Sequence, residues 1–140
     1  MTCIKLLCGR GYMKPIAILV HVPDISVGLE WYKKAFPMAT ANYLAEFDFT
    51  VLTIGEFMIE IVQADEKVGV GKSGTVLYWS VENVSDAIAF FSSIGATLYR
   101  GPLNIENGFV MCQVENPFGN LIGLRGKTHN ESILLSEDQV

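Results

Sequence analysis

The chain has 140 residues, half of them apolar and 18% charged, with a formal net charge of −5. This composition is typical of a single folded domain and excludes an intrinsically disordered chain. The acidic balance argues against nucleic-acid binding, because phosphate groups would be repelled, and no apolar run approaches the roughly 20 residues of a membrane span.

Residues 1–13 are expected to be an N-terminal extension. Their short apolar pieces are interrupted by Lys5 and Arg10, so they do not resemble a signal peptide. An odd number of cysteines without paired spacing favours a reducing, cytoplasmic setting; these are Cys3, Cys8 and Cys112. Cys112 lies in an apolar run and is expected to be a buried thiol.

The first half of the sequence predicts a strand, a helix and three strands. The apolar run 15–22 is typical of a buried strand. Asp24 or Ser26 can cap a helix that ends before Pro37. One face of that helix is apolar, with Ile25, Leu29, Tyr32 and Phe36 at helical spacing.

Trp31 lies off this apolar face, which predicts a subunit contact or a half-exposed side chain. The three strands are expected at 41–47, 49–54 and 57–63. Residues 65–73, polar and rich in glycine, are the predicted linker to the second half.

The second half predicts the same order of elements. A strand at 75–81 precedes a helix that Asn83 or Ser85 can cap and that Gly95 ends. Its apolar face is formed by Val84, Ile88, Phe91 and Ile94. Strands are expected at 96–100, 109–115 and 121–125, with a break at Gly101-Pro102 and a turn at 116–120. Residues 127–140 are expected to be a flexible polar tail.

The two halves repeat each other at a constant offset of 59 residues. Asp24 corresponds to Asn83, and Tyr32 to Phe91. A repeat of this kind is read as two copies of one structural unit. We therefore predict an α+β domain over 14–126, in which two βαβββ modules (14–64 and 74–126) form a cupped mixed sheet. The helices cover the convex side, and the concave side is free to form a cleft.

Two motifs resemble the vicinal oxygen chelate superfamily, which includes glyoxalase I, extradiol dioxygenases and the bleomycin-resistance proteins. They are Val22-Pro23-Asp24-Ile25 with Trp31-Tyr32, and Asn116-Pro117-Phe118-Gly119-Asn120-Leu121-Ile122. The resemblance implies four metal-ligand positions on the strands, at Ala17, Glu60, Val76 and Gly123. Only Glu60 has a donor side chain, and one carboxylate cannot hold a catalytic divalent ion. We therefore expect no metal or other cofactor.

Alternation of side chains along the predicted strands assigns a set of residues to the cleft. These pocket residues are His21, Met58, Glu60, Tyr78, Phe109, Met111, Glu115 and Arg125. Such a mixture of apolar, aromatic and a few polar groups is usual for a small-molecule site. Alternative interpretations stay open: Glu60 can pair with Arg125 or point to water, His21 can be a hydrogen-bonded histidine, and the apolar members can belong to the core or to a dimer interface.

These observations lead to two hypotheses. In the first, the chain is a metal-free small-molecule-binding protein without catalytic residues. It is closest in character to the bleomycin-resistance branch and sequesters a cationic or aromatic compound in a resistance-type role. The resemblance implies a homodimer with the pocket between subunits. In the second, it is a metal-dependent lyase or dioxygenase whose atypical site uses Glu60, His21 and either Glu115 or a residue of a partner subunit.

Overall fold

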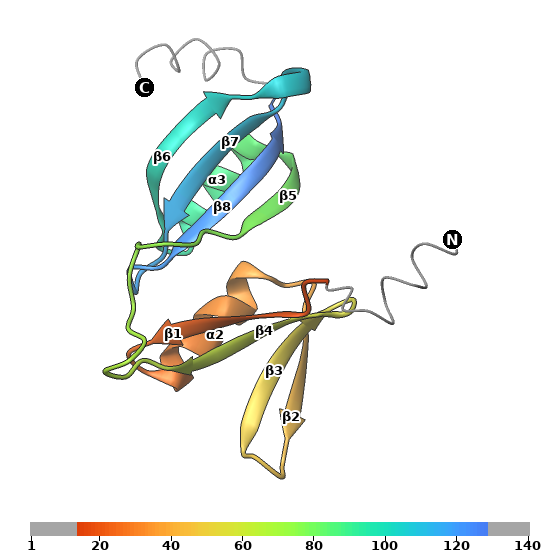
Figure 1. The fold of residues 1–140 in the computed structure, drawn as a ribbon. Coiled ribbons are helices and arrows are strands. Elements are labelled where there is room, and N and C mark those ends of the chain that lie inside the picture. Colours follow the sequence, from red (N-terminus) through yellow and green to blue (C-terminus); the bar gives the residue numbers. More distant parts are fainter. Residues whose placement is uncertain (1–13, 129–140) are drawn as a thin grey trace.

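The computed structural model describes residues 14–128. Its elements follow the order β1 (Ala17–Val22), α2 (Ile25–Ala35), β2 (Thr40–Leu44), β3 (Phe49–Ile54), β4 (Phe57–Gln63), β5 (Tyr78–Asn83), α3 (Val84–Ser93), β6 (Thr97–Asn104), the 3-10 helix η1 (Glu106–Gly108), β7 (Val110–Glu115) and β8 (Leu121–Lys127). The βαβββ order thus occurs twice, which confirms the predicted two-module α+β fold (Figure 1).

Each module builds its own four-stranded mixed sheet. The strand orders are β1-β4-β3-β2 and β5-β8-β7-β6. The first strand of each module runs parallel to the last, and the other pairings are antiparallel. Helix α3 lies against one face of the second sheet and leaves the other face open (Figure 1). Between residues 14 and 128, strand hydrogen bonds join strands of the same module only.

The internal repeat is visible in the hydrogen bonds. The Asp24 carboxylate caps α2 by accepting from the Val27 N–H at 3.3 Å, and the Asn83 side chain caps α3 by accepting from the Asp86 N–H at 2.9 Å. These two caps lie 59 residues apart, as the repeat predicts. Of the two predicted alternatives at each helix, the earlier residue is therefore the cap.

Several boundaries differ from the prediction. Strand β2 ends at Leu44, because residues 45–48 form a turn with Asp48 at a positive φ of 49°. Strand β5 begins at Tyr78 instead of residue 75, since its pairing with β8 starts there.

Two further boundaries concern the second half. Strand β6 continues to Asn104 through the cis peptide Gly101-Pro102, where a break was predicted. An edge strand tolerates proline because its outer N–H groups need no partner in the sheet. Strand β8 includes Lys127, which was assigned to the tail. Residues 1–13 and 129–140, the predicted extension and the remaining tail, lie outside the described residues.

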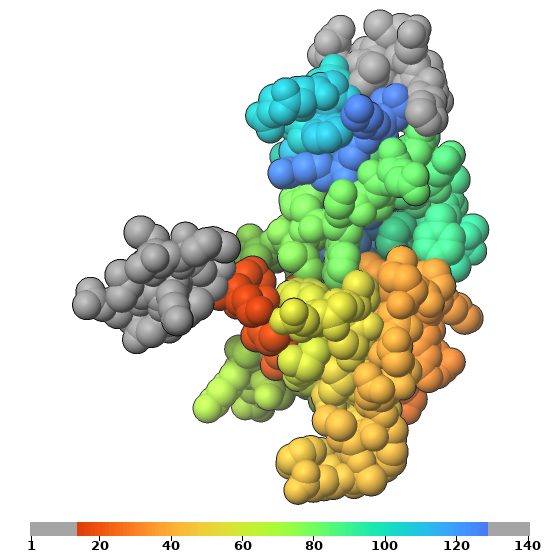
Figure 2. Space-filling view, turned by 90° about the vertical axis from the view of Figure 1, so that its right-hand side faces the viewer, coloured from red at the N-terminus to blue at the C-terminus, as the bar shows by residue number. Residues whose placement is uncertain are grey.

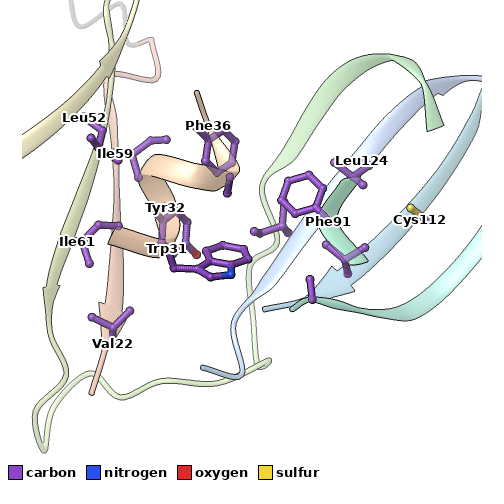
Figure 3. Close-up of a cluster of buried hydrophobic side chains, with 14 of the residues drawn as sticks. Val22, Trp31, Tyr32, Phe36, Leu52, Ile59, Ile61, Phe91, Cys112 and Leu124 are labelled. Atoms are coloured by element: carbon purple, nitrogen blue, oxygen red, sulfur yellow. The ribbon is translucent and has the colours of Figure 1, made fainter. Parts of the chain in front are cut away.

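An aromatic cluster joins the two modules. The side chains of α2 point toward Phe91 of the other module (Figure 3). The rings of Phe36 and Trp79 pack against each other at a tilt of 48°, with centroids 4.6 Å apart. Trp31 is only 8% exposed and donates from Nε1 to the Ile94 carbonyl at 2.7 Å. The prediction of a subunit contact or a half-exposed Trp31 was wrong. The second module covers the side of α2 that lies outside its predicted apolar face, and Trp31 is buried there.

The predicted turn 116–120 also holds the modules together. Asn116 is 3% exposed and donates from Nδ2 to the Tyr32 hydroxyl at 3.0 Å, while Asn120 donates from Nδ2 to the His21 carbonyl at 3.2 Å. The motif that carried the resemblance therefore has a structural role at the contact between modules. Figure 2 shows the modules stacked on each other, with the β2–β3 hairpin projecting from the lower one. No helix within residues 14–128 has the length and apolar character needed to cross a membrane.

Candidate functional site

The open face of the second sheet follows from the alternation of side chains along β7. Val110, Cys112 and Val114 are at most 1% exposed and face α3. Met111 and Gln113 therefore point to the open face. Burial raises the pKa of the Cys112 thiol to about 12, so this thiol is not an activated nucleophile.

A cavity of about 590 Å³ lies on this open face, beside β5 and β8. Predicted pocket residues in its wall are Tyr78, Phe109 and Arg125. Glu82 and Lys127 line it as well. The volume is within the range of small-molecule sites.

The Tyr78 ring has a fixed position in this cavity. It lies over Gly123, where an added Cβ atom would be 2.6 Å from the ring. The Gln113 side-chain amide donates to the Tyr78 hydroxyl at 2.8 Å. These two contacts hold the ring flat against the sheet.

Two cations lie over the aromatic rings of the cavity. The Arg125 guanidinium carbon is 5.1 Å from the centroid of Tyr78, and the Lys127 ammonium is 5.8 Å from the centroid of Phe109. Both distances suit cation–π contacts. Glu82 contributes the one carboxylate of the wall, but among the described residues it forms no ion pair with either cation.

The remaining predicted pocket residues of the second module lie along β7. Met111 is the strand partner of Arg125, but it is not among the residues that line the cavity. Glu115 lies at the far end of β7, where it pairs with Lys72 at 3.2 Å. It does not line the cavity.

The predicted pocket residues of the first module lie apart from this cavity. Met58 and Glu60 are half-buried on the open face of the first sheet, beside Ala17 and Leu19 of β1. No ion pair joins Glu60 to Arg125 within residues 14–128.

His21 lines a separate pocket of about 160 Å³ near Gly69 and Asn120. Nearby, the Val68 and Lys67 backbone N–H groups donate to the Asp65 carboxylate and lower its pKa. His21 is thus engaged at the linker and not at the larger cavity.

A larger groove of about 870 Å³ runs between the modules. Its wall is largely aromatic and aliphatic, with Phe36, Met38, Ile54, Trp79, Phe90 and Phe91 among its residues. It contains two carboxylates, Glu82 and Asp86, and no cationic side chain. The smaller cavity on the second sheet differs from the groove because its wall holds the cations Arg125 and Lys127, so it is the better site for an anionic ligand.

Comparison with solved structures identifies proteins of similar architecture. A glyoxalase/bleomycin resistance protein/dioxygenase family enzyme from Burkholderia phytofirmans is 16% identical, with a TM-score of 0.63 over 79% of this chain and 96% of that chain. A glyoxalase/bleomycin resistance protein from Albidiferax ferrireducens is 17% identical, with a TM-score of 0.59 over 79% of this chain and 97% of that one. The chain has the glyoxalase/bleomycin-resistance fold.

The resemblance seen in the sequence is therefore confirmed at the level of the fold. An integron cassette protein from Vibrio cholerae is also similar to this chain, at 21% identity and a TM-score of 0.63 over 84% of this chain and 96% of that one. No protein-family model and no curated protein matches the sequence. Similarity at such low sequence identity shows the fold alone. The function of this chain must therefore be argued from the residues of its own candidate site.

The residues present do not fit the metal centre that the fold implies. In the strand register, Glu60 lies beside Leu19, and Gly123 lies beside Tyr78. Ala17 lies beside Met58, and Val76 precedes β5. Within residues 14–128, no three His, Cys, Asp or Glu side chains gather closely enough to hold a metal ion. The set Glu60, His21 and Glu115 is thus not brought together, and no reaction step can be derived through a metal.

Sequence reasoning missed the two other charged residues of the cavity wall, Glu82 and Lys127. The alternation of side chains between the two faces of a strand could have identified both residues. Glu82 continues the series of Tyr78 and Ser80, and Lys127 follows Arg125 at the same spacing of two residues. They were overlooked because each lies beyond the predicted end of its strand.

Proposed function

We propose that the chain binds a small aromatic molecule on the open face of its second module and holds it without converting it. The observation that carries this proposal is the 590 Å³ cavity, whose wall combines the fixed Tyr78 ring with Phe109 and Arg125. Rings held in place lose little entropy when a ligand stacks on them. This is the function of a sequestering protein, in agreement with the first of the two hypotheses.

We further propose that a second copy of the chain binds to the exposed edges of the two sheets. Large apolar side chains are exposed on the outer strands and in the turn of the β2–β3 hairpin: Tyr43 at 61%, Phe47 at 69% and Tyr99 at 47%. Exposed apolar groups on edge strands favour association with another chain. A partner copy seated there would cover them and add a further wall above the open sheet faces.

A ligand screen tests the proposed function. The purified protein is heated with a panel of aromatic compounds that includes anionic, neutral and cationic members, and Tm is recorded. Compounds that bind the folded state raise Tm. The Tyr78→Ala variant should bind the same compounds about tenfold more weakly, because a stacking surface is lost.

The control is Val68→Ala, which truncates an exposed apolar side chain of the linker, outside the cavity and the proposed dimer contact. It should leave ligand affinity unchanged. If no compound of any charge raises Tm, or if Tyr78→Ala and Val68→Ala behave alike, the cavity is not a binding site and the proposal fails.

A further inference from the structure

We infer that the molecule held in this cavity is an organic anion, an aromatic carboxylate whose charged group binds Arg125. This inference rests on the proposed function and adds the chemical class of the ligand. The sequence had led us to expect a cationic or aromatic compound, with Glu60 as the acidic group. Glu60 lies on the other sheet, and the cavity of the second module contains different charges.

The charge of the cavity favours an anion. Its wall holds two cations, Arg125 and Lys127, and one carboxylate, Glu82, which leaves a net charge of +1. The whole chain has a formal net charge of −5. A locally positive cavity in an acidic protein attracts anions to this place and not to the rest of the surface.

The donors of Arg125 are free to bind a ligand. Within residues 14–128, the guanidinium makes no ion pair and no hydrogen bond; its contact is with the Tyr78 ring. A cation–π contact stabilises the positive charge without using its N–H groups. The planar fork of an arginine side chain matches the two oxygens of a carboxylate.

Tyr78 can supply a further donor. Gln113 donates to the Tyr78 oxygen, so the hydroxyl proton does not point at Gln113 and can be given to an acceptor in the cavity. Gly123 keeps the ring flat against the sheet, with the guanidinium above it. A planar ligand that enters the cavity beside Tyr78 and Phe109 therefore meets the cationic donors that lie over these rings.

The inference is tested with three probes that share one ring system and differ in charge: naphthoate, naphthamide and naphthylmethylammonium. Their dissociation constants are measured by calorimetry with the full chain. Naphthoate should bind about tenfold more tightly than naphthamide, because a charge-assisted pair with arginine is added, and the ammonium should bind most weakly. Added salt should weaken the binding of naphthoate and leave that of naphthamide unchanged.

Variants assign the preference to a residue. Arg125→Gln should remove the advantage of naphthoate over naphthamide while naphthamide binding stays the same, and Arg125→Lys should retain part of the advantage. Arg125 is exposed, so these changes leave the fold intact. Arg100→Gln, which removes the same charge from exposed edge strand β6, is the matched control and should preserve the preference.

The possible failures are distinct. If all three probes bind equally and Tyr78→Ala weakens them, the proposed function stands and the anion inference is overturned. Tighter binding of the ammonium, or an unchanged preference in Arg125→Gln, also overturns the inference. If none of the probes binds, the inference is overturned, and the wider panel decides the proposed function separately.

Discussion

Position 123 sets the geometry of the cavity through its lack of a side chain. An ideal Cβ atom there would lie 2.6 Å from the Tyr78 ring, closer than carbon atoms can approach. The ring occupies the space of the missing side chain, and Gln113 fixes its hydroxyl. The shape of the binding surface therefore depends on a pair of neighbouring residues on β5 and β8, Tyr78 and Gly123.

We expect Gly123→Ala to displace the Tyr78 ring and to lower the free energy of unfolding by about 1–3 kcal/mol, the usual cost of overpacking. Urea denaturation measures this change. In the Tyr78→Ala background the same substitution should cost much less, because the clash is gone; the two effects are then strongly non-additive. Additive effects would show that the ring does not depend on Gly123.

The helix caps are the clearest sign of the repeat at the scale of elements. Asp24 begins α2 and Asn83 begins α3, each by accepting an N–H three residues later. The two helices occupy the same place in their modules, since each follows the first strand. Their caps should therefore contribute similarly to stability.

We predict that Asp24→Ala and Asn83→Ala each lower the free energy of unfolding by about 1 kcal/mol, since each leaves a helical N–H without its acceptor. Chemical denaturation measures both. Asp24→Asn and Asn83→Asp retain an acceptor and serve as controls with little loss. A negligible effect at one cap only would mean that the two helix starts are not equivalent.

The sequence predicted both modules and the residues at their helix starts, because periodicity and capping are local properties. It could not predict the aromatic contact between modules, since the second module that covers Trp31 is distant in sequence. The same limit applies to β6, where an edge position lets the strand pass Pro102. Whether a proline ends a strand depends on what lies beside it.

The candidate site was predictable in part for the same reason. Alternation along β5 and β8 identified Tyr78 and Arg125, both of which line the cavity. It also grouped them with Glu60 and His21, which lie on the first module. Alternation assigns a side chain to a face but does not tell which faces meet, and the modules form separate sheets.

At the scale of the whole molecule, contacts between modules make the chain one body. The Trp31 and Asn116 hydrogen bonds cross between them, and residues from both modules share one buried cluster. The open face of the second sheet still carries its cavity at the surface. The exposed apolar side chains of the β2–β3 hairpin are covered by neither module.

We expect the protein to sediment as a homodimer, with the β2–β3 hairpin in the interface. Replacing its exposed aromatic residues by polar ones, as in Tyr43→Ser with Phe47→Ser, should shift the equilibrium toward monomer, because apolar surface no longer drives association. Analytical ultracentrifugation measures the dissociation constant. Val68→Ser, which changes an exposed apolar residue of the linker, should have no effect, and a monomeric unmodified chain would refute the expectation.

The close approach of Tyr78 to Gly123 also restricts how this site can change over generations. Any single substitution that gives position 123 a side chain, including the aspartate or glutamate of a metal ligand, collides with the ring and is penalised at once. Tyr78 must first be exchanged for a smaller residue, which removes the aromatic floor of the cavity. A ligand-type side chain at position 123 could thus be gained only after the aromatic ring of the proposed binding site is lost, so a single van der Waals contact fixes the order of these two substitutions.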